Sequence, residues 1–120
     1  LMPHDQYFYK SIASTIGHEL THAVTFTKKT YNRIKTGDTT AKRAEIFLDE
    51  GISHLSENLI GYGISGGNIK FFHAFLSNTL GYSFCKNSAA GLDDSVGQRG
   101  AMTLFLSWCF YIIKTTLQEW

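Results

Sequence analysis

The segment that most constrains the fold of this chain is His18-Glu19-Leu20-Thr21-His22, in which two histidines are separated by four positions. On an α-helix, residues at this spacing lie one turn above each other on the same face, so both imidazoles can converge on one ion. Glu19 directly follows the first histidine and would point toward the open side of that ion. The sequence therefore predicts a helix here with a metal site on one face.

This H-E-x-x-H arrangement is typical of zinc-dependent hydrolases. Zinc bound by neutral imidazole nitrogens lowers the pKa of a coordinated water to about 7. A neighbouring carboxylate can take the proton from that water and pass it to a leaving amine, which makes Glu19 the candidate general base. The alternative is an ordinary amphipathic helix that carries two histidines by chance.

A catalytic zinc needs a third protein ligand and keeps one position open for water. Glu50 is the best candidate, because it lies far enough downstream of His22 for a second helix to fold back against the first. The small residue Gly51 would let that helix approach the metal closely. We therefore predict one Zn²⁺ per chain, held by His18, His22 and Glu50.

Glu50, His54 and Glu57 are at positions i, i+4 and i+7 of the expected second helix, close to one line on its surface. A metal-bound histidine almost always donates its other ring N–H to a carboxylate, carbonyl or water. Glu57 and His54 are candidates for that acceptor. Glu57 is preferred, since a carboxylate accepts an N–H without needing a particular tautomer. The alternative for Glu57 is a solvent-exposed helix residue.

These segments resemble thermolysin-like, or gluzincin, metallopeptidases. The run HELTHAVT from His18 to Thr25 is similar to the motif helix of that family, and the segment from Asp49 to Ser53 is similar to its second ligand motif. Phe47 to Gly63 and Arg99 to Leu106 also resemble secreted bacterial hyicolysin-like peptidases. The resemblance implies the same three zinc ligands, a peptide or protein substrate, and a secreted or cell-envelope location.

The sequence also departs from the gluzincin pattern. His54 stands where that family has an acidic residue that holds a ligand imidazole, so Glu57 would have to take this role. The family stabilises the oxyanion with a Tyr or His that has no clear match here. The candidates are Tyr62, Tyr82, Arg99 and His73, although a lone histidine among phenylalanines is more often a residue at the edge of the core.

Apolar residues at spacings of three or four predict helices throughout. The expected ranges are from an N-cap at Asp5 to about Lys29, from Thr40 or Ala41 to Ile60, from Asn68 to Leu80, and from about Ser95 to Leu117. The first helix, with its apolar stripe, is expected to be mostly buried. Loops are expected from Tyr31 to Thr40 and from Gly81 to Gly97. No confident strand is present, so the predicted fold is mainly α.

Length and charge limit the alternatives. A chain of 120 residues that is 43% hydrophobic suits a single domain, and a net charge of +1 argues against a nucleic-acid surface. The apolar run from Ala101 to Ile113 fits a buried core helix better than a membrane span. Cys85 and Cys109 permit at most one disulfide and lack the C-x-x-C spacing of a zinc or redox site.

Residues 1–120 are therefore expected to form a four-helix, zincin-like subdomain without the β-sheet that gluzincins place upstream of the motif helix. The chain begins abruptly and ends in an expected helix, so we expect a fragment whose parent protein supplies the sheet. The leading hypothesis is the catalytic subdomain of a zinc endopeptidase. The alternatives are a catalytically inactive helical module that binds metal or another protein, and a helical bundle without metal.

Overall fold

A computed structural model describes residues 3–42, 45–63, 67–82 and 95–118 of the chain. Its elements are α1 (Pro3–Phe26), the π-helical turn η1 (Thr27–Tyr31), α2 (Asn32–Lys35), α3 (Ile46–Leu59), α5 (Asn68–Ser77), the 3₁₀ turn η2 (Thr79–Gly81) and α6 (Val96–Gln118). All regular secondary structure in these ranges is helical, so the prediction of a mainly α fold is confirmed for them.

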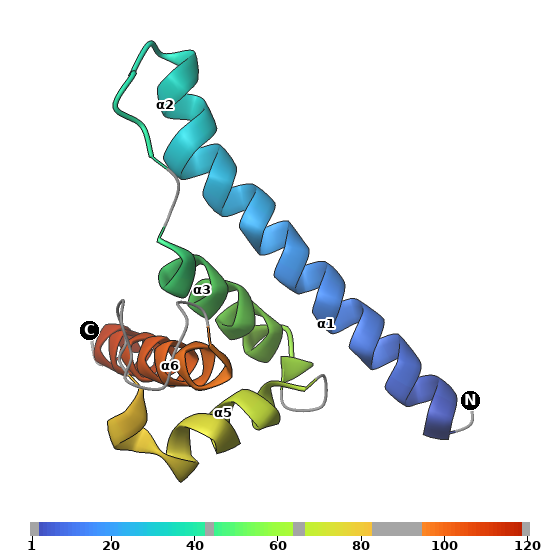
Figure 1. Cartoon of the computed structure of the whole chain (residues 1–120). Coiled ribbons are helices and arrows are strands. Elements are labelled where there is room, and N and C mark those ends of the chain that lie inside the picture. Colours follow the sequence, from blue (N-terminus) through green and yellow to red (C-terminus); the bar gives the residue numbers. More distant parts are fainter. Residues whose placement is uncertain (1–2, 43–44, 64–66, 83–94, 119–120) are drawn as a thin grey trace.

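α3 is the central element of the arrangement. α1, η1 and α2 form one long rod that passes along the outside of the molecule (Figure 1). α1 packs against α3, α3 packs against α6, and α6 packs against α5. Both helices that carry the sequence motifs are therefore direct neighbours.

α3 begins at Ile46, so the predicted start at Thr40 or Ala41 is wrong. The backbone of Glu45 is extended, with φ −62° and ψ 138°, so the helix begins only after this residue. Within the predicted loop, the carboxylate of Asp38 accepts hydrogen bonds from the backbone N–H and the hydroxyl of Thr40 and pairs with the guanidinium of Arg33 at 2.6 Å. These contacts fix a turn there.

Other predicted boundaries shift by about one and a half turns or less. They are the N-cap at Asp5, which lies inside α1, the loop start at Tyr31, which lies in η1, and the helix end at Leu80, which lies in η2. The chain stays helical through Lys35 because η1 and α2 continue the axis of α1 (Figure 1). The predicted loop that begins at Gly81 lies mostly outside the described residues.

The end of α3 is fixed by Gly61, which has a φ of +86°. The N–H of Tyr62 donates to the carbonyl of Glu57 at 3.0 Å, and the N–H of Gly61 donates to the carbonyl of Asn58 at 3.0 Å. This pairing is a Schellman C-cap, in which a left-handed residue is best supplied by glycine. It ends the helix one turn after Glu57.

Glycines mark the closest approaches between helices. A Cβ on Gly51 of α3 would overlap Met102 of α6, and a Cβ on Gly100 of α6 would overlap the backbone of Phe71 in α5. The prediction that Gly51 brings α3 close to a metal is therefore wrong. Neighbouring residues of a helix are rotated by about 100°, so Gly51 faces α6 while Glu50 faces α1.

The apolar stripe of α1 is exposed, so the prediction that this helix is mostly buried is wrong. Ile16, Leu20 and Val24 are 53%, 61% and 53% exposed. They lie two positions away from His18 and His22 and therefore on the opposite face of the helix. α1 turns its histidine face toward α3 and leaves its apolar face uncovered by the described residues.

α6 is long and apolar enough to cross a membrane by length and composition, and 22% of its most apolar window is buried. Its first turns, from Gly97 to Thr103, are largely buried, whereas Trp108 and Leu117 are exposed. The prediction of a buried core helix is thus right only for the beginning of α6. Cys109 of α6 is a free thiol, and Cys85 lies outside the described residues.

Candidate metal centre

α1 and α3 bring three predicted ligands together. The Nε2 atoms of His18 and His22 are 3.0 Å apart. The carboxylate of Glu50 lies opposite them, with one oxygen 3.4 Å from Nε2 of His18 and the other 3.5 Å from Nε2 of His22. Ligands bound tetrahedrally to zinc at 2.0 to 2.1 Å are separated by about 3.4 Å. The three side chains therefore have the spacing of a zinc site.

Polar contacts fix the register between the two helices. The hydroxyl of Thr21 lies 2.8 Å from that of Ser56, and the Ser56 hydroxyl lies 3.3 Å from the carbonyl of Gly17. A Cβ on Gly17 would come within 2.6 Å of the end of the Ile60 side chain. The close approach of α1 and α3 places the histidine face of α1 directly over the acidic residues of α3.

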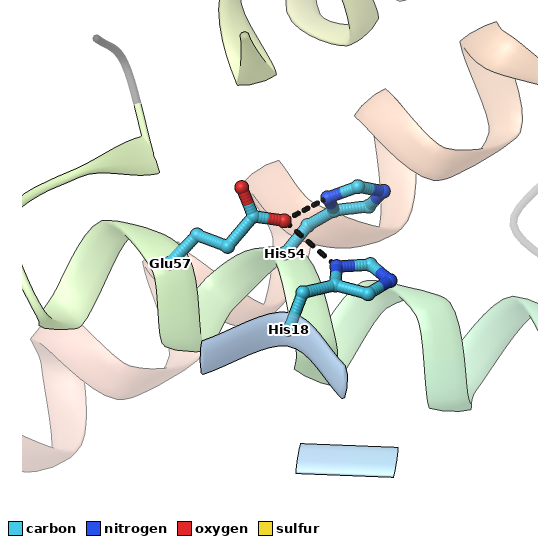
Figure 2. Close-up of side chains that lie close together, drawn as sticks. All are labelled: His18, His54 and Glu57. Carbon is cyan, nitrogen blue, oxygen red and sulfur yellow. Dashed lines mark hydrogen bonds and ion pairs between the residues drawn. The ribbon is translucent and has the colours of Figure 1, made fainter. Parts of the chain in front are cut away.

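Glu57 holds two imidazoles at once. Its Oε1 atom accepts from Nδ1 of His18 and from Nδ1 of His54, each at 2.7 Å (Figure 2). Its other oxygen accepts from the hydroxyl of Ser14. Glu57 is only 6% exposed, so the alternative of a solvated helix residue is wrong. Because a carboxylate only accepts, the Nδ1 atom of His18 carries a proton and its Nε2 atom is left to face Glu50.

His22 has an equivalent acceptor that the sequence analysis did not identify. Its Nδ1 atom lies 2.9 Å from Oδ2 of Asp49 and 3.2 Å from the hydroxyl of Ser53. Where two helices run antiparallel, a residue one turn later on the first faces an earlier position on the second. Asp49 lies about two turns before Glu57 on α3. The sequence alone carried no signal for this role of Asp49, because the role follows from the antiparallel pairing of α1 with α3.

The carboxylates change the ionisation of the cluster. Hydrogen bonding to Glu50 and then to Glu57 raises the pKa of His18 from 6.5 to about 9, against the opposing effect of burial. The same contact with His18 lowers the pKa of Glu50. Burial opposes ionisation of Glu57, but hydrogen bonds from His18, His54 and Ser14 outweigh it and lower the pKa of Glu57 to about 2. The cluster therefore favours a bound cation.

The remaining predicted residues lie in different places. Glu19 is exposed on α1, next to His18. Of the four oxyanion candidates, Arg99 contacts the cluster, with Nη1 2.9 Å from Oε2 of Glu50. The other three are His73, which is exposed on α5 rather than at the edge of the core, Tyr82, whose ring covers Gly97 of α6, and Tyr62, whose backbone caps α3.

Two clefts border the cluster. One has a volume of about 490 Å³ and is lined by His22, Asp49 and Glu50 together with Phe26, Thr30 and Ile46. The other has a volume of about 210 Å³ and is lined by His18, His54, Glu57, Lys70, Phe71 and Arg99. The first cleft has an apolar wall, and the second carries two cationic side chains. The cluster is therefore bordered by two clefts of different chemical character.

The resemblance to thermolysin-like peptidases depends on short motifs. The histidines and carboxylates of those motifs, His18, His22, Asp49 and Glu50, meet between α1 and α3. No family model matches this sequence, and no curated protein or solved structure matches it significantly.

Proposed function

We propose that this chain is the zinc-binding catalytic part of an endopeptidase. The observation that supports this proposal best is the meeting of His18 Nε2, His22 Nε2 and the Glu50 carboxylate at mutual separations of 3.0 to 3.5 Å. Two imidazoles and one carboxylate, with a fourth position left open, are the donor set of a catalytic zinc. Oε2 of Glu50 is buried and is paired with the guanidinium of Arg99 at 2.9 Å, which keeps this carboxylate in its charged, metal-binding form.

Different residues of the protein would have different roles in hydrolysis. Bound zinc would supply Lewis acidity to a water and to the scissile carbonyl. Glu57 and Asp49 accept the Nδ1 protons of His18 and His22 and thereby hold the opposite nitrogens toward the metal. Glu19 takes the proton from the attacking water and delivers it to the leaving amine.

Arg99 is the oxyanion candidate with the best position. Its guanidinium lies beside Glu50 and lines the smaller cleft, where it places a fixed positive charge next to the reacting centre. Such a charge stabilises negative charge that develops in the transition state. Arg99 would also keep the Glu50 carboxylate in place.

The substrate would be a peptide or protein lying across the two clefts. In gluzincins a β-sheet precedes the motif helix and pairs with extended substrates. The exposed apolar face of α1, which includes Ile16 and Leu20, is a surface that such a sheet from the parent protein could cover. A secreted or cell-envelope location and the absence of a membrane span are part of the same proposal.

Elemental analysis of the purified chain tests the metal centre. We expect one zinc per chain, lost in His18→Ala and in His22→Ala and retained in His73→Ala, which removes an exposed histidine of α5. Absence of metal from the zinc-loaded, folded chain would reject the proposal. Cleavage of an unfolded protein is measured on the intact parent protein. Bound zinc without cleavage there would favour the inactive metal-binding module.

A further inference from the structure

The smaller of the two clefts contains a cation that the proposed mechanism does not use. The cleft is lined by residues of α1, α3, α5 and α6, and it reaches the candidate metal centre at His18. Lys70 lies on its α5 side and is exposed. Nζ of Lys70 lies 4.9 Å from the centroid of the Phe71 ring, and no ion pair joins it to an acidic side chain of the described residues. The charge of Lys70 is therefore available to a ligand.

Buried contacts fix the turn of α5 that carries Lys70. Asn68, two residues earlier, is 1% exposed, and its Nδ2 atom donates to the carbonyl of His54 at 2.9 Å. On the other side, a Cβ on Gly100 of α6 would overlap the backbone of Phe71. The start of α5 is thus held beside the metal centre, and only the Lys70 side chain has to move to meet a ligand.

A second cation adds to the positive charge of this cleft. Cζ of Arg99 lies 5.9 Å from the centroid of the same Phe71 ring. Arg99 is paired with Glu50, so it acts on the cleft through its charge, whereas Lys70 can contact a ligand directly. Glu57 also lines the cleft, but both of its oxygens already accept hydrogen bonds. The charge of bound zinc would offset the two carboxylates and leave the two basic side chains in excess, which favours an anion.

The larger cleft has the opposite character. Its ionisable side chains are His22, which is a proposed zinc ligand, and the carboxylates Asp49 and Glu50. An anionic group on a ligand bound at the metal would therefore be directed into the smaller cleft. The volume of that cleft, about 210 Å³, is below the roughly 300 to 1,000 Å³ of pockets that hold a whole small molecule. It suits one side chain or one chain end.

We propose that Lys70 selects peptide substrates that carry a carboxylate next to the scissile bond, by pairing with that carboxylate in the smaller cleft. The carboxylate belongs either to an acidic side chain or to the C-terminus of the peptide, since both present the same group to the ammonium. This inference rests on the proposed function and names its substrate class. It makes Lys70 a determinant of specificity, without a part in the hydrolysis itself.

Peptide hydroxamates test this inference on the zinc-loaded full chain, because the hydroxamate binds zinc and no turnover is needed. The neutral probe has glutamine next to the hydroxamate and an amidated C-terminus. A second probe replaces the glutamine with glutamate, and a third keeps the glutamine and has a free C-terminal carboxylate. Calorimetry should show that one charged probe binds about 10-fold more tightly than the neutral probe, an effect between those of an exposed ion pair and of a hydrogen bond to a charged group. The preferred probe identifies the source of the carboxylate.

Lys70→Gln should abolish this preference, and Lys70→Glu should reverse it. Lys114→Gln, which removes an exposed lysine of α6 outside both clefts, should retain it. Zinc content and circular dichroism should be the same in all three variants, because both lysines are exposed. Equal affinity for the three probes, or a preference that survives Lys70→Gln, would overturn the inference and leave the proposed function intact. A chain that holds no zinc, or that holds zinc and binds none of the probes, would overturn both.

Discussion

α3 packs against its two neighbours in different ways. Its contact with α1 is built from hydrogen bonds, in which Glu57 and Asp49 hold the histidines and Ser56 meets Thr21. Apart from the ion pair between Arg99 and Glu50, its contact with α6 is built from close apposition, in which Gly51 admits the side chain of Met102. The described residues thus join α1 to the rest of the molecule chiefly through the groups that would serve a metal.

This difference implies that the two interfaces respond to different perturbations. The α1–α3 interface depends on protonation and on a bound cation, since its buried groups are ionisable. The α3–α6 interface depends on side-chain volume, since added atoms have nowhere to go. Changes of charge should therefore act on the first interface, and changes of size on the second.

The largest expected effect is on catalysis, and it should leave both interfaces of α3 unchanged. Glu19→Gln should reduce the peptidase turnover of the zinc-loaded protein by about 10²- to 10⁴-fold, because an amide cannot carry the proton. Zinc content and thermal stability should stay the same, since Glu19 is exposed. Turnover assays and elemental analysis on the same sample check this. Normal turnover in a metal-replete variant would remove Glu19 as the base.

The next effect concerns the carboxylates that hold the histidines. Glu57→Ala should weaken zinc binding by about 10- to 100-fold, measured by competition with a chelator, because Nδ1 of His18 loses its acceptor. Asp49→Ala should weaken it less, since the Asp49 side chain is 29% exposed and that of Glu57 is 8% exposed. Asp5→Ala, in the first turn of α1, is the control. Equal affinity in all three variants would count against this role of the carboxylates.

The residues that the sequence located correctly are those whose positions follow from helical geometry. His18 and His22 are one turn apart, and Glu50 and Glu57 share one face of α3, so each pair could be placed before the fold was known. The helical character of the chain was also predictable from the apolar spacing.

The features that the sequence could not locate depend mainly on which face of each helix packs against which neighbouring helix. Periodicity identified an apolar stripe on α1 but could not show that the histidine face, rather than Ile16 and Leu20, meets α3. Asp49 was missed because its role arises only from the antiparallel pairing of α1 with α3. The start of α3 was missed because periodicity does not show that the backbone at Glu45 is extended.

Two glycine substitutions compare how tightly side chains are packed at the two interfaces. Gly51→Ala should destabilise the chain by about 1 to 2 kcal/mol, because overpacking against the base of the Met102 side chain costs more than the helix propensity gained. Gly17→Ala gains the same helix propensity, and its added methyl group meets only the end of the Ile60 side chain. The free energy of unfolding of this variant should therefore change by less than about 0.5 kcal/mol. Urea denaturation of both variants measures the difference. Equal destabilisation would show that the two interfaces are packed alike.

The last expected effect is the pH dependence of the metal-free chain. His18 has a pKa raised from 6.5 to about 9, so its contribution to stability is complete below pH 6.5 and is lost as the pH rises through 9. Glu57 has a pKa lowered from 4.5 to about 2, so its contribution is complete above pH 4.5 and is lost as the pH falls through 2.

Stability should therefore be greatest between about pH 4.5 and 6.5, as measured by urea denaturation across the range. His18→Gln should remove the decline on the alkaline side, whereas His73→Gln should retain it. Zinc should also remove that decline, because the metal replaces the proton on Nε2 of His18, and binding between pH 6.5 and 9 should release that proton. Calorimetry in buffers of different ionisation enthalpy measures the release. A metal-free chain whose stability is constant from pH 6 to 9 would show that the α1–α3 interface does not depend on the charge of His18.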